Sequence, residues 1–420
     1  MHEQSANRFA SRSVTSDMSR FDALLALSCL FDFMVFAVLL WLSARHVSSK
    51  GTMRVGAGIL LAALCGAIGI VAAKTLTVAV LGLEVFGLIH LLYLDLALVA
   101  PAVGVLILVF RVMKVPGVGS VSFGACGTIA ALCSFLLIPL CVYTTYVEPF
   151  NLKVESCDVV APRMASDKSH IKIAVLADMQ FDEVTAHEHR AVDLAMQANP
   201  DLILIPGDVF QGVEKQYRVQ ESAIKSLLAK LEAPGGVYVV SGDCDRLSTL
   251  TKAIAGSQIQ LIDNQIKQVE VRGTTIAVAG IPIEYRSSQA KDTLYKASTI
   301  ADRTDLTIVL AHRPGISLLP YMPDNIDLIV AGHTHGGQIQ IPGFGPPVTA
   351  SPVPKVVAAG GLSELNDHLL YVSRGVGCER GHAPRIRFCC PPEVSILTVG
   401  GSPTHVALKQ TPDVTGSDLN

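Results

Sequence analysis

Residues 327–338 read Asp-Leu-Ile-Val-Ala-Gly-His-Thr-His-Gly-Gly-Gln. The apolar run is typical of a short buried strand, and a polar cluster begins where it ends. Alternate residues of an extended segment point to the same face, so His333 and His335 can both face one site. The flanking glycines let the backbone approach a ligand closely and adopt unusual angles. We predict a strand that ends in a pair of ligating imidazoles.

The same arrangement, an apolar run followed at once by polar residues, recurs four times before residue 327. The carboxyl ends of strands in an α/β sheet open onto the crevice where ligands bind, so we expect these clusters to converge on one rim. An isolated Asp after a strand is more often a helix cap, but five clusters in order are hard to attribute to chance. Carboxylates mixed with imidazoles suit Mn, Zn or Fe rather than Ca. Asp178 and Gln180 follow the run 171–177, and Asp208 follows the run 202–205. Asp243, Cys244 and Asp245 follow the run 237–240, and His312 follows the run 306–310.

Strands and helices alternate through the rest of this region, which favours a layered α/β domain. Residues 148–170 are polar and predict a connector, and the tail after residue 400 is polar as well. The expected helices are 184–199 and 222–231, and the further strands are 275–279, 369–372 and 394–398.

The first 146 residues hold most of the apolar content of a 420-residue chain that is 50% hydrophobic and 16% charged. A membrane-spanning helix needs about 20 mostly apolar residues. We predict four spans, from the runs 24–42, 55–73, 76–110 and 121–146. Five is the alternative, since the third run is long enough for a helical hairpin. The acidic residues inside the runs are either functional or face neighbouring helices; these are Asp32, Glu84 and Asp95.

Lys and Arg in the loops after the first span and before the last one place both loops on the inner side. The C-terminal domain then lies on the outer face of the plasma (inner) membrane. The expected organisation is an N-terminal tail (1–22), a transmembrane region (23–147), an α/β domain (148–400) and a flexible tail (401–420). A net charge of −3 disfavours a nucleic-acid partner. No P-loop and no Gly-x-Ser-x-Gly elbow occur.

The motif order Asp-x-Gln, Gly-Asp, Gly-Asp-Cys-Asp, Ala-His and Gly-His-Thr-His-Gly-Gly-Gln resembles the calcineurin-like metallophosphoesterases. Within them it is similar to the membrane-associated bacterial branch of the YkuE and YaeI type. The likeness covers about residues 148–400. It is supported by two further segments, 371–375 and 391–393. The resemblance implies a four-layer αββα sandwich and two divalent metal ions (Mn, Zn or Fe) bridged by one carboxylate. The fold class that we expect is therefore an N-terminal helical transmembrane region followed by an α/β domain with this sandwich fold.

The resemblance also implies a role for each matching residue. Two cations a few Å apart acidify a bridging water and neutralise a phosphoryl group. Asp208 would bridge the two metals. The first metal would be held by Asp178, His335 and, as a weak neutral ligand, Gln180; the second by Asp243, His312 and His333.

Three departures from the family pattern bear on activity. Gln180 stands where the family usually has His, and Asp243 stands where it usually has Asn. Cys244 replaces a His that helps the leaving group depart, and with Asp245 it occupies the position implied for catalysis. General acid catalysis contributes about 10²–10⁴-fold, so reduced activity is expected. His382 or Arg380 is an alternative source of the missing proton.

The expected function is that of a membrane-tethered phosphoesterase that cleaves a phosphoester, phosphodiester or diphosphate bond by metal-activated hydroxide. Its substrate would be a phosphorylated small molecule or a lipid-linked or envelope compound, with membrane lipid as partner and no nucleic acid. The alternative is a catalytically degenerate domain that binds metal or phosphate as a sensor or structural membrane partner. The Gln180 and Cys244 changes motivate that alternative.

Overall fold

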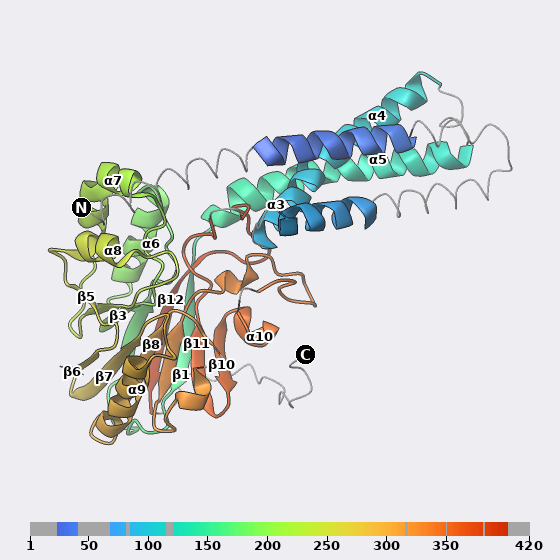
Figure 1. Cartoon of the computed structure of the whole chain (residues 1–420). Helices are drawn as coiled ribbons and strands as arrows, with labels where there is room; N and C mark the ends of the chain where they lie inside the picture. The colour runs from blue at the N-terminus through green and yellow to red at the C-terminus, as the bar shows by residue number, and fades with distance from the viewer. Residues whose placement is uncertain are drawn as a thin grey trace. The chain divides into compact units, whose positions relative to one another are not determined.

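The computed structural model describes residues 23–40, 68–80, 85–114, 121–315, 318–349, 351–380 and 383–401 (Figure 1). The chain divides into two compact units. The first holds residues 1–146 and 380–385, and the second holds residues 147–379 and 386–420. His382, an alternative proton source, lies outside the described residues.

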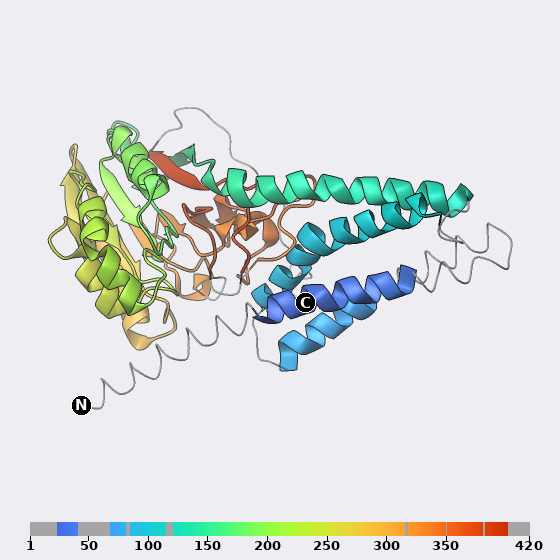
Figure 2. The ribbon, with the colours of Figure 1, turned by 90° about the horizontal axis from the view of Figure 1, so that it is seen from above.

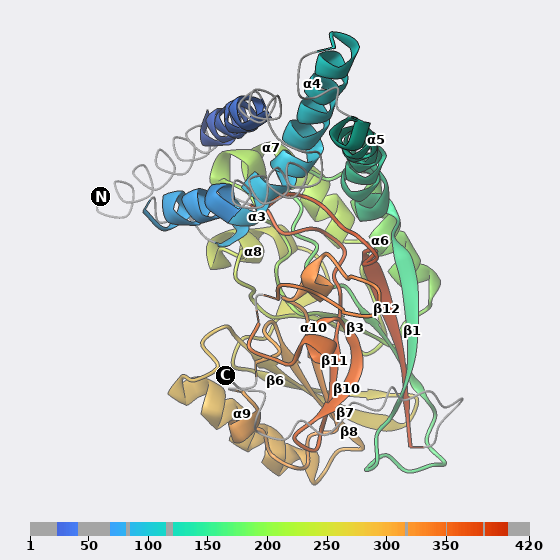
Figure 3. The same cartoon turned by 90° about the vertical axis from the view of Figure 1, so that its right-hand side faces the viewer.

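The described part of the first unit is helical. Two helices, Ala23–Leu40 and Ile68–Val80, precede a continuous helical stretch. That stretch contains α3 (Val85–Leu94), a π-helical turn η2 (Asp95–Val99) and α4 (Ala100–Val112). Helix α5 (Val121–Val142) follows and runs beside α4 (Figures 2 and 3). The contact between α4 and α5 depends on Gly104, because a Cβ there would clash with the Ser134 hydroxyl.

Three helices among the described residues are long and apolar enough to cross a membrane: Ala23–Leu40, Phe86–Val112 and Gly127–Phe150. Helix Ile68–Val80 is apolar but shorter. The third predicted run forms one continuous helix from Val85 to Val112, and its first residues belong to the preceding helix. The second predicted span lies mostly outside the described residues, so the expected number of four or five remains a prediction.

The second unit is an α/β domain, as the sequence predicted, and its strands form two mixed six-stranded sheets. One sheet has the order β1-β12-β2-β3-β4-β5, and the other has the order β10-β11-β9-β8-β7-β6 (Figure 1). The strands of the first sheet are β1 (Lys153–Val160), β2 (Ile171–Val175), β3 (Leu202–Ile205), β4 (Val237–Val239), β5 (Ile259–Leu261) and β12 (Glu393–Gly400). Those of the second are β6 (Ile266–Val271), β7 (Thr274–Ile281), β8 (Leu306–Ala311), β9 (Leu328–Ala331), β10 (Gly361–Leu365) and β11 (His368–Val372).

Side-chain alternation along the strands builds the layers. Leu202 and Leu204 of β3 point into a core between the two sheets, while Ile203 and Ile205 point into a core beneath helices. Helices α6 (Ala186–Gln197), α7 (Glu214–Leu228) and α8 (Leu247–Ile254) cover the first sheet. Helices α9 (Ser288–Ala301) and α10 (Lys355–Ala358) cover the second. The layers run helices, sheet, sheet, helices.

Strand β1 lies in the segment that we expected to be a connector. It pairs in parallel with β12 along its whole length, from Lys153 opposite Glu393 to Val160 opposite Gly400 (Figure 3). Most of its residues are exposed or half-buried, which explains why no apolar run marks it in the sequence. Helix α6 begins at a capping box in which Thr185 and Glu188 satisfy each other's backbone N–H groups.

Candidate metal centre

The predicted residues converge because parallel strands deliver them to the same edge of the two sheets. Strands β2, β3 and β4 are parallel neighbours, and so are β8 and β9. Each of these strands ends just before one of the polar clusters. The loops after them carry Asp178 and Gln180, Asp208, Asp243, His312, and His333 with His335.

Several of these residues have backbone angles that side chains rarely adopt. The φ angles are +47° at Asp178, +54° at Asp208, +71° at His333 and +49° at His335, and Gln180 lies at +41°. A non-glycine residue in this region costs on the order of 1 kcal/mol or more and persists only where the surrounding structure holds it, most often at functional sites. The clustering of such angles at one edge of the sheets is typical of functional sites.

Glycines allow the loops to approach one another closely. A Cβ on Gly242 would clash with the backbone and carboxylate of Asp208. A Cβ on Gly332 would lie 2.5 Å from Oδ2 of Asp178. The backbone N–H of His333 donates to both carboxylate oxygens of Asp178, at 3.0 and 2.9 Å, so the two loops are also tied by hydrogen bonds.

Two groups of ligand atoms are close enough to share a metal ion, and His312 belongs to both. Asp178, Asp208 and His312 form one group, in which the donor atoms lie within 4.8 Å of one another. Nδ1 of His312 lies 3.8 Å from Asp178, and Nε2 lies 3.5 Å from Asp208. Nδ1 also donates to the Pro206 carbonyl at 2.8 Å, which leaves Nε2 as the ligating nitrogen.

The second group contains Asp243, His312 and His333. Oδ2 of Asp243 lies 3.0 Å from Nδ1 of His333 and 3.3 Å from Nε2 of His312. The two imidazoles meet edge to face, with 5.0 Å between their centroids. The structure therefore brings together the three residues predicted for the second metal.

Gln180 and His335 carry buried polar atoms that have no hydrogen-bond partner among the described residues. The Gln180 amide donates to Oδ2 of Asp208 at 2.8 Å, which leaves its oxygen without a donor. His335 is 3% exposed, and neither ring nitrogen has a partner. Leaving a buried polar group unpaired is costly. Orphaned atoms beside carboxylates and imidazoles fit a site that holds divalent cations, so the residues present match the predicted metals.

The pKa values show how densely charge is packed here. Burial alone would lower the pKa of His312, but the carboxylates of Asp208, Asp243 and Asp178 raise it to about 10. Burial, followed by the Asp208 charge, raises the pKa of Asp178. Burial would also raise the pKa of Asp243, but hydrogen bonds from His312, His333 and Arg313 outweigh it and hold the pKa well below its usual range. Without a cation, a protonated His312 offsets part of the carboxylate charge.

The two residues predicted to be catalytic, Cys244 and Asp245, lie beside Asp208. The backbone N–H of Cys244 donates to Oδ1 of Asp208 at 2.8 Å, and the Cys244 sulfur lies 3.5 Å from the Gln180 amide nitrogen. Burial and then the Asp208 charge raise the pKa of the Cys244 thiol far above its ordinary value. Asp245 accepts from the backbone N–H groups of Asp208, Gly242 and Val209, at 2.7, 2.9 and 3.0 Å. Burial followed by the Asp208 charge raises its pKa to about 6.

Two arginines at the site were absent from the prediction. Arg313 donates to Asp243 from Nε at 2.9 Å and also from Nη2. Arg387 is fully buried, and its guanidinium donates to the carbonyls of Arg374, Gly375, Gly377 and Cys390. Arg313 directly follows a predicted ligand in the sequence, and that position was the available signal. Nothing in the sequence around Arg387 marks it.

The comparison with known families agrees with this geometry. Residues 171–337 match the family model described as calcineurin-like phosphoesterase. This chain carries a calcineurin-like phosphoesterase domain. The family comprises metal-dependent hydrolases with a dinuclear metal centre, so the predicted enzyme class, a metal-dependent phosphoric ester hydrolase, is confirmed at the level of the family.

Bacterial relatives of the expected type match most of their own length. The Bacillus subtilis metallophosphoesterase YkuE is 28% identical over 61% of this chain and 88% of its own. The Escherichia coli phosphodiesterase YaeI is 27% identical over 61% of this chain and 91% of its own. The Chlamydia trachomatis UDP-2,3-diacylglucosamine pyrophosphatase LpxG is 24% identical over 66% and 98%. The match to the Caenorhabditis elegans protein F40B5.2, 28% identical, covers 50% of this chain and only 45% of that protein.

Proposed function

We propose that the chain is a membrane-tethered phosphoesterase that uses two divalent cations to hydrolyse a phosphoester, phosphodiester or diphosphate bond. The observation that carries this proposal is the convergence of five side chains at one edge of the sheets: Asp178, Asp208, Asp243, His312 and His333. Beside them, the Gln180 side-chain oxygen and the His335 ring nitrogens are buried without a hydrogen-bond partner among the described residues. Titratable groups with strongly shifted pKa values that gather in this way are typical of functional sites.

The residue roles follow the predicted scheme. Asp178, His335 and the Gln180 oxygen would hold one cation, and Asp243, His312 and His333 the other, with Asp208 between them. When bound, the two cations supply activation of a water and neutralisation of phosphoryl charge. His312 presents Nε2 to the site because the Pro206 carbonyl fixes its Nδ1–H. The identity of the metals is open among Mn, Zn and Fe.

Cys244 and Asp245 take different parts in this proposal. Cys244 is a neutral thiol close to Asp208, and it is a poor proton donor because its pKa lies so high. Asp245 fixes the backbone around Asp208 through the N–H groups that donate to it, so we propose it as a positioning residue. The chain would then favour substrates with a good leaving group.

The apolar helices and the relatives suggest where the substrate lies. We propose that helices Ala23–Leu40, Phe86–Val112 and Gly127–Phe150 hold the chain in the plasma (inner) membrane, with the second unit on its outer face. A tethered hydrolase meets lipid-linked or envelope phosphates at high local concentration. YaeI is named a phosphodiesterase and LpxG a pyrophosphatase of a diacylated sugar nucleotide, which supports these two bond types as candidates.

The test is hydrolysis by the full-length chain purified in detergent, with Mn, Zn or Fe added, on an aryl phosphodiester and a lipid-linked diphosphate. Asp208→Asn should abolish turnover on both, since it removes the carboxylate shared by the two metals. Asp193→Asn is the matched control, because Asp193 lies on α6 in an exposed ion pair with Lys230. This variant should keep full activity. Metal binding without turnover in the wild type would favour the degenerate alternative.

A further inference from the structure

The loop that follows His335 in the second unit forms a closed turn. The backbone N–H of Ile341 donates to the Gly345 carbonyl at 3.0 Å, and the N–H of Gly345 donates back to the Ile341 carbonyl at 2.8 Å. Gly343 and Gly345 have φ angles of +77° and +78°, which glycine adopts without strain. A Cβ on either glycine would meet open space. The turn therefore projects from the surface of the second unit.

The base of this turn is held by hydrogen bonds to two other segments. The backbone N–H of Gln340 donates to the Phe388 carbonyl at 2.8 Å, and the N–H of Phe388 donates to the Gln338 carbonyl at 2.9 Å. The side-chain amide of Gln340 donates to the carbonyls of Gly336 and Ala359, at 3.1 and 2.8 Å. A surface that is already ordered gives up little conformational entropy when it binds a partner.

The side chains that the turn and the helix after it expose are large and apolar. Phe344 is 62% exposed, Ile341 is 43% exposed and Val348 is 40% exposed. Val356, on α10, is 46% exposed. We call these four residues the apolar rim. Single exposed apolar residues are ordinary, but several gathered on one short segment mark a surface that binds an apolar partner.

The apolar rim also carries a cation. Nζ of Lys355, an exposed residue of α10, lies 4.7 Å from the centroid of the Phe344 ring. Lysine keeps its ammonium group in a polar layer while its alkyl stem lies along an apolar one. Surfaces that combine basic and large apolar side chains bind the boundary between lipid head groups and acyl chains. The charge of Lys355 therefore favours a membrane surface that contains anionic lipid.

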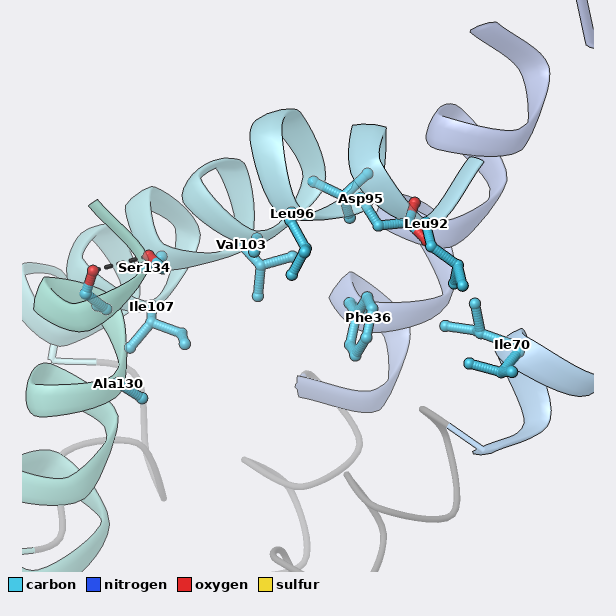
Figure 4. Close-up of a pocket in the computed structure, with 14 residues that line it drawn as sticks. Phe36, Ile70, Leu92, Asp95, Leu96, Val103, Ile107, Ala130 and Ser134 are labelled. Atoms are coloured by element: carbon cyan, nitrogen blue, oxygen red, sulfur yellow. Dashed lines mark hydrogen bonds between the residues drawn. The ribbon is translucent and has the colours of Figure 1, made fainter. Parts of the chain in front are cut away.

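The first unit indicates which apolar partner the chain brings with it. Its helices expose apolar side chains such as Leu98, at 58%, and Val105, at 49%. Their interior is apolar as well, since a pocket of about 460 Å³ between them is lined almost entirely by apolar side chains, among them Phe36 and Val103 (Figure 4). Helices that are apolar all round belong in a protein core or in a membrane. A lipid bilayer is thus the apolar phase nearest to hand.

We propose that the apolar rim inserts into the lipid–water interface of the membrane that holds the first unit, with Lys355 at the phosphates of anionic lipids. Because the rim follows directly on the loop that carries His333 and His335, this contact would bring lipid head groups to the side of the metal centre. The inference rests on the membrane location proposed above. It does not depend on turnover at the metal centre.

The test is quenching of tryptophan emission by brominated acyl chains, with the full-length chain in nanodiscs of phosphatidylcholine and phosphatidylglycerol. Trp41 is the single tryptophan of the chain, so Trp41→Phe provides a silent background. In that background, Phe344→Trp should lose emission when brominated lipid replaces plain lipid. Val219→Trp is the matched control, because Val219 is an apolar residue of the second unit that is 75% exposed on α7. Its emission should be the same in both lipids.

Lys355 provides a second arm. Lys355→Gln, added to Phe344→Trp, should lower the ratio of inserted to free rim about fivefold, since one lysine contributes about that factor near an anionic surface. Lys355→Arg should restore the quenching. Equal quenching of the Phe344→Trp and Val219→Trp chains, or quenching that Lys355→Gln leaves unchanged, would overturn the proposal.

Two further outcomes separate the proposals from each other. Emission from Phe344→Trp that is blue-shifted but unquenched would overturn the insertion, because a protein surface would then cover the rim. A chain that does not stay with the nanodiscs would refute the membrane location and this inference with it. The readout needs no hydrolysis, so an inactive metal centre would leave the quenching as predicted.

Discussion

At the scale of single residues, the charge of Asp243 is offset by a neighbour. An Asp in place of the family's usual Asn adds a negative charge beside an anionic substrate. Arg313, the residue after His312, lies against that carboxylate with two donors. Its planar fork matches a carboxylate in a way that an ammonium group does not. Arg313 therefore offsets the negative charge that Asp243 adds relative to the family's usual Asn.

Arg313→Gln is expected to raise KM for an anionic phosphodiester while kcat changes little. The pair is partly exposed, with 42% of the Arg313 side chain accessible, so we expect a modest effect of about threefold to tenfold. Arg313→Lys retains the charge, so its KM should lie between those of the wild type and Arg313→Gln. Steady-state kinetics at fixed metal concentration checks this, and an unchanged KM for Arg313→Gln would show that Asp243 needs no compensation.

Cys244→His should increase turnover of substrates with poor leaving groups. The half-buried Cys244 thiol has a raised pKa and is a weak acid at neutral pH, whereas an imidazolium can donate a proton to the departing oxygen. The expected gain is about tenfold or more in kcat for an alkyl phosphodiester, and smaller for an aryl one. Equal gains for both substrates would argue against a role in protonating the leaving group.

The convergence of single residues could be predicted where the fold supplies a rule. Polar residues after parallel strands meet at one edge, and this rule was sufficient to bring His312 and His333 together with Asp243. It was not sufficient for Arg313 or Arg387, because the direction of a loop side chain depends on partners distant in the sequence. The left-handed backbone at Asp178 and Asp208 was also unpredicted, since neither residue type demands it.

At the scale of elements, the loop after β11 is held by a buried arginine. Arg387 donates to the carbonyls of Arg374, Gly375 and Gly377, and the same loop donates from Gly377 to the Asp178 carbonyl at 2.8 Å. One guanidinium thus orders a segment that contacts Asp178, which is predicted to be a metal ligand. A buried guanidinium without a carboxylate partner is tolerated because carbonyl oxygens satisfy its donors.

Arg387→Lys is expected to lower the free energy of unfolding by about 2–4 kcal/mol, because an ammonium group cannot reach all of these carbonyls. Arg218→Lys, on the exposed face of α7, is the control and should change stability by less than about 0.5 kcal/mol. Denaturant unfolding monitored by circular dichroism measures both. Equal stability of the two variants would show that the loop does not depend on Arg387.

Asp305 links β7 to the start of β8 and should make stability depend on pH. Its carboxylate accepts from the Thr275 N–H at 2.8 Å and from Lys168 at 3.0 Å, and these contacts lower its pKa below 3.8. The contribution is therefore fully present above pH 3.8 and is lost as the pH falls through the lower folded-state pKa. Asp305→Asn should cost less than about 1 kcal/mol at pH 7, since the group is largely solvated.

Thermal unfolding of Asp305→Asn against the wild type at several pH values checks this prediction. The difference in Tm should be present at pH 7 and should shrink in acid. A difference that grows as the pH falls would contradict the proposed linkage.

Fully buried strands were predictable from the sequence, whereas a largely exposed strand and a helix without an apolar run were missed. Strand β3 was expected at 202–205 and is found there because all of its residues are buried. Strand β1 was missed because its partner, β12, follows more than 200 residues later and its own side chains are largely solvated. Helix α9 was missed because Ala, Ser, Thr and Lys dominate its sequence and no long apolar run marks it.

At the scale of the whole molecule, an apolar helical unit and an α/β unit are distinct in sequence and in structure. The composition change near residue 147 coincides with the boundary between the two compact units. The family match stops at residue 337, although β10, β11 and β12 complete the two sheets after it. The family match therefore covers the candidate metal centre but not all the strands of the two sheets.

We propose that this edge of the two sheets holds two metal ions and that the chain hydrolyses a phosphoester there. The most direct measurement is the metal content per chain of the full-length protein together with Mn-dependent hydrolysis of an aryl phosphodiester, for the wild type and for His333→Ala. We predict about two metal ions per wild-type chain, with less metal and no turnover in His333→Ala. A wild-type chain that binds no metal after loading, or whose turnover is unchanged in His333→Ala, would contradict the account.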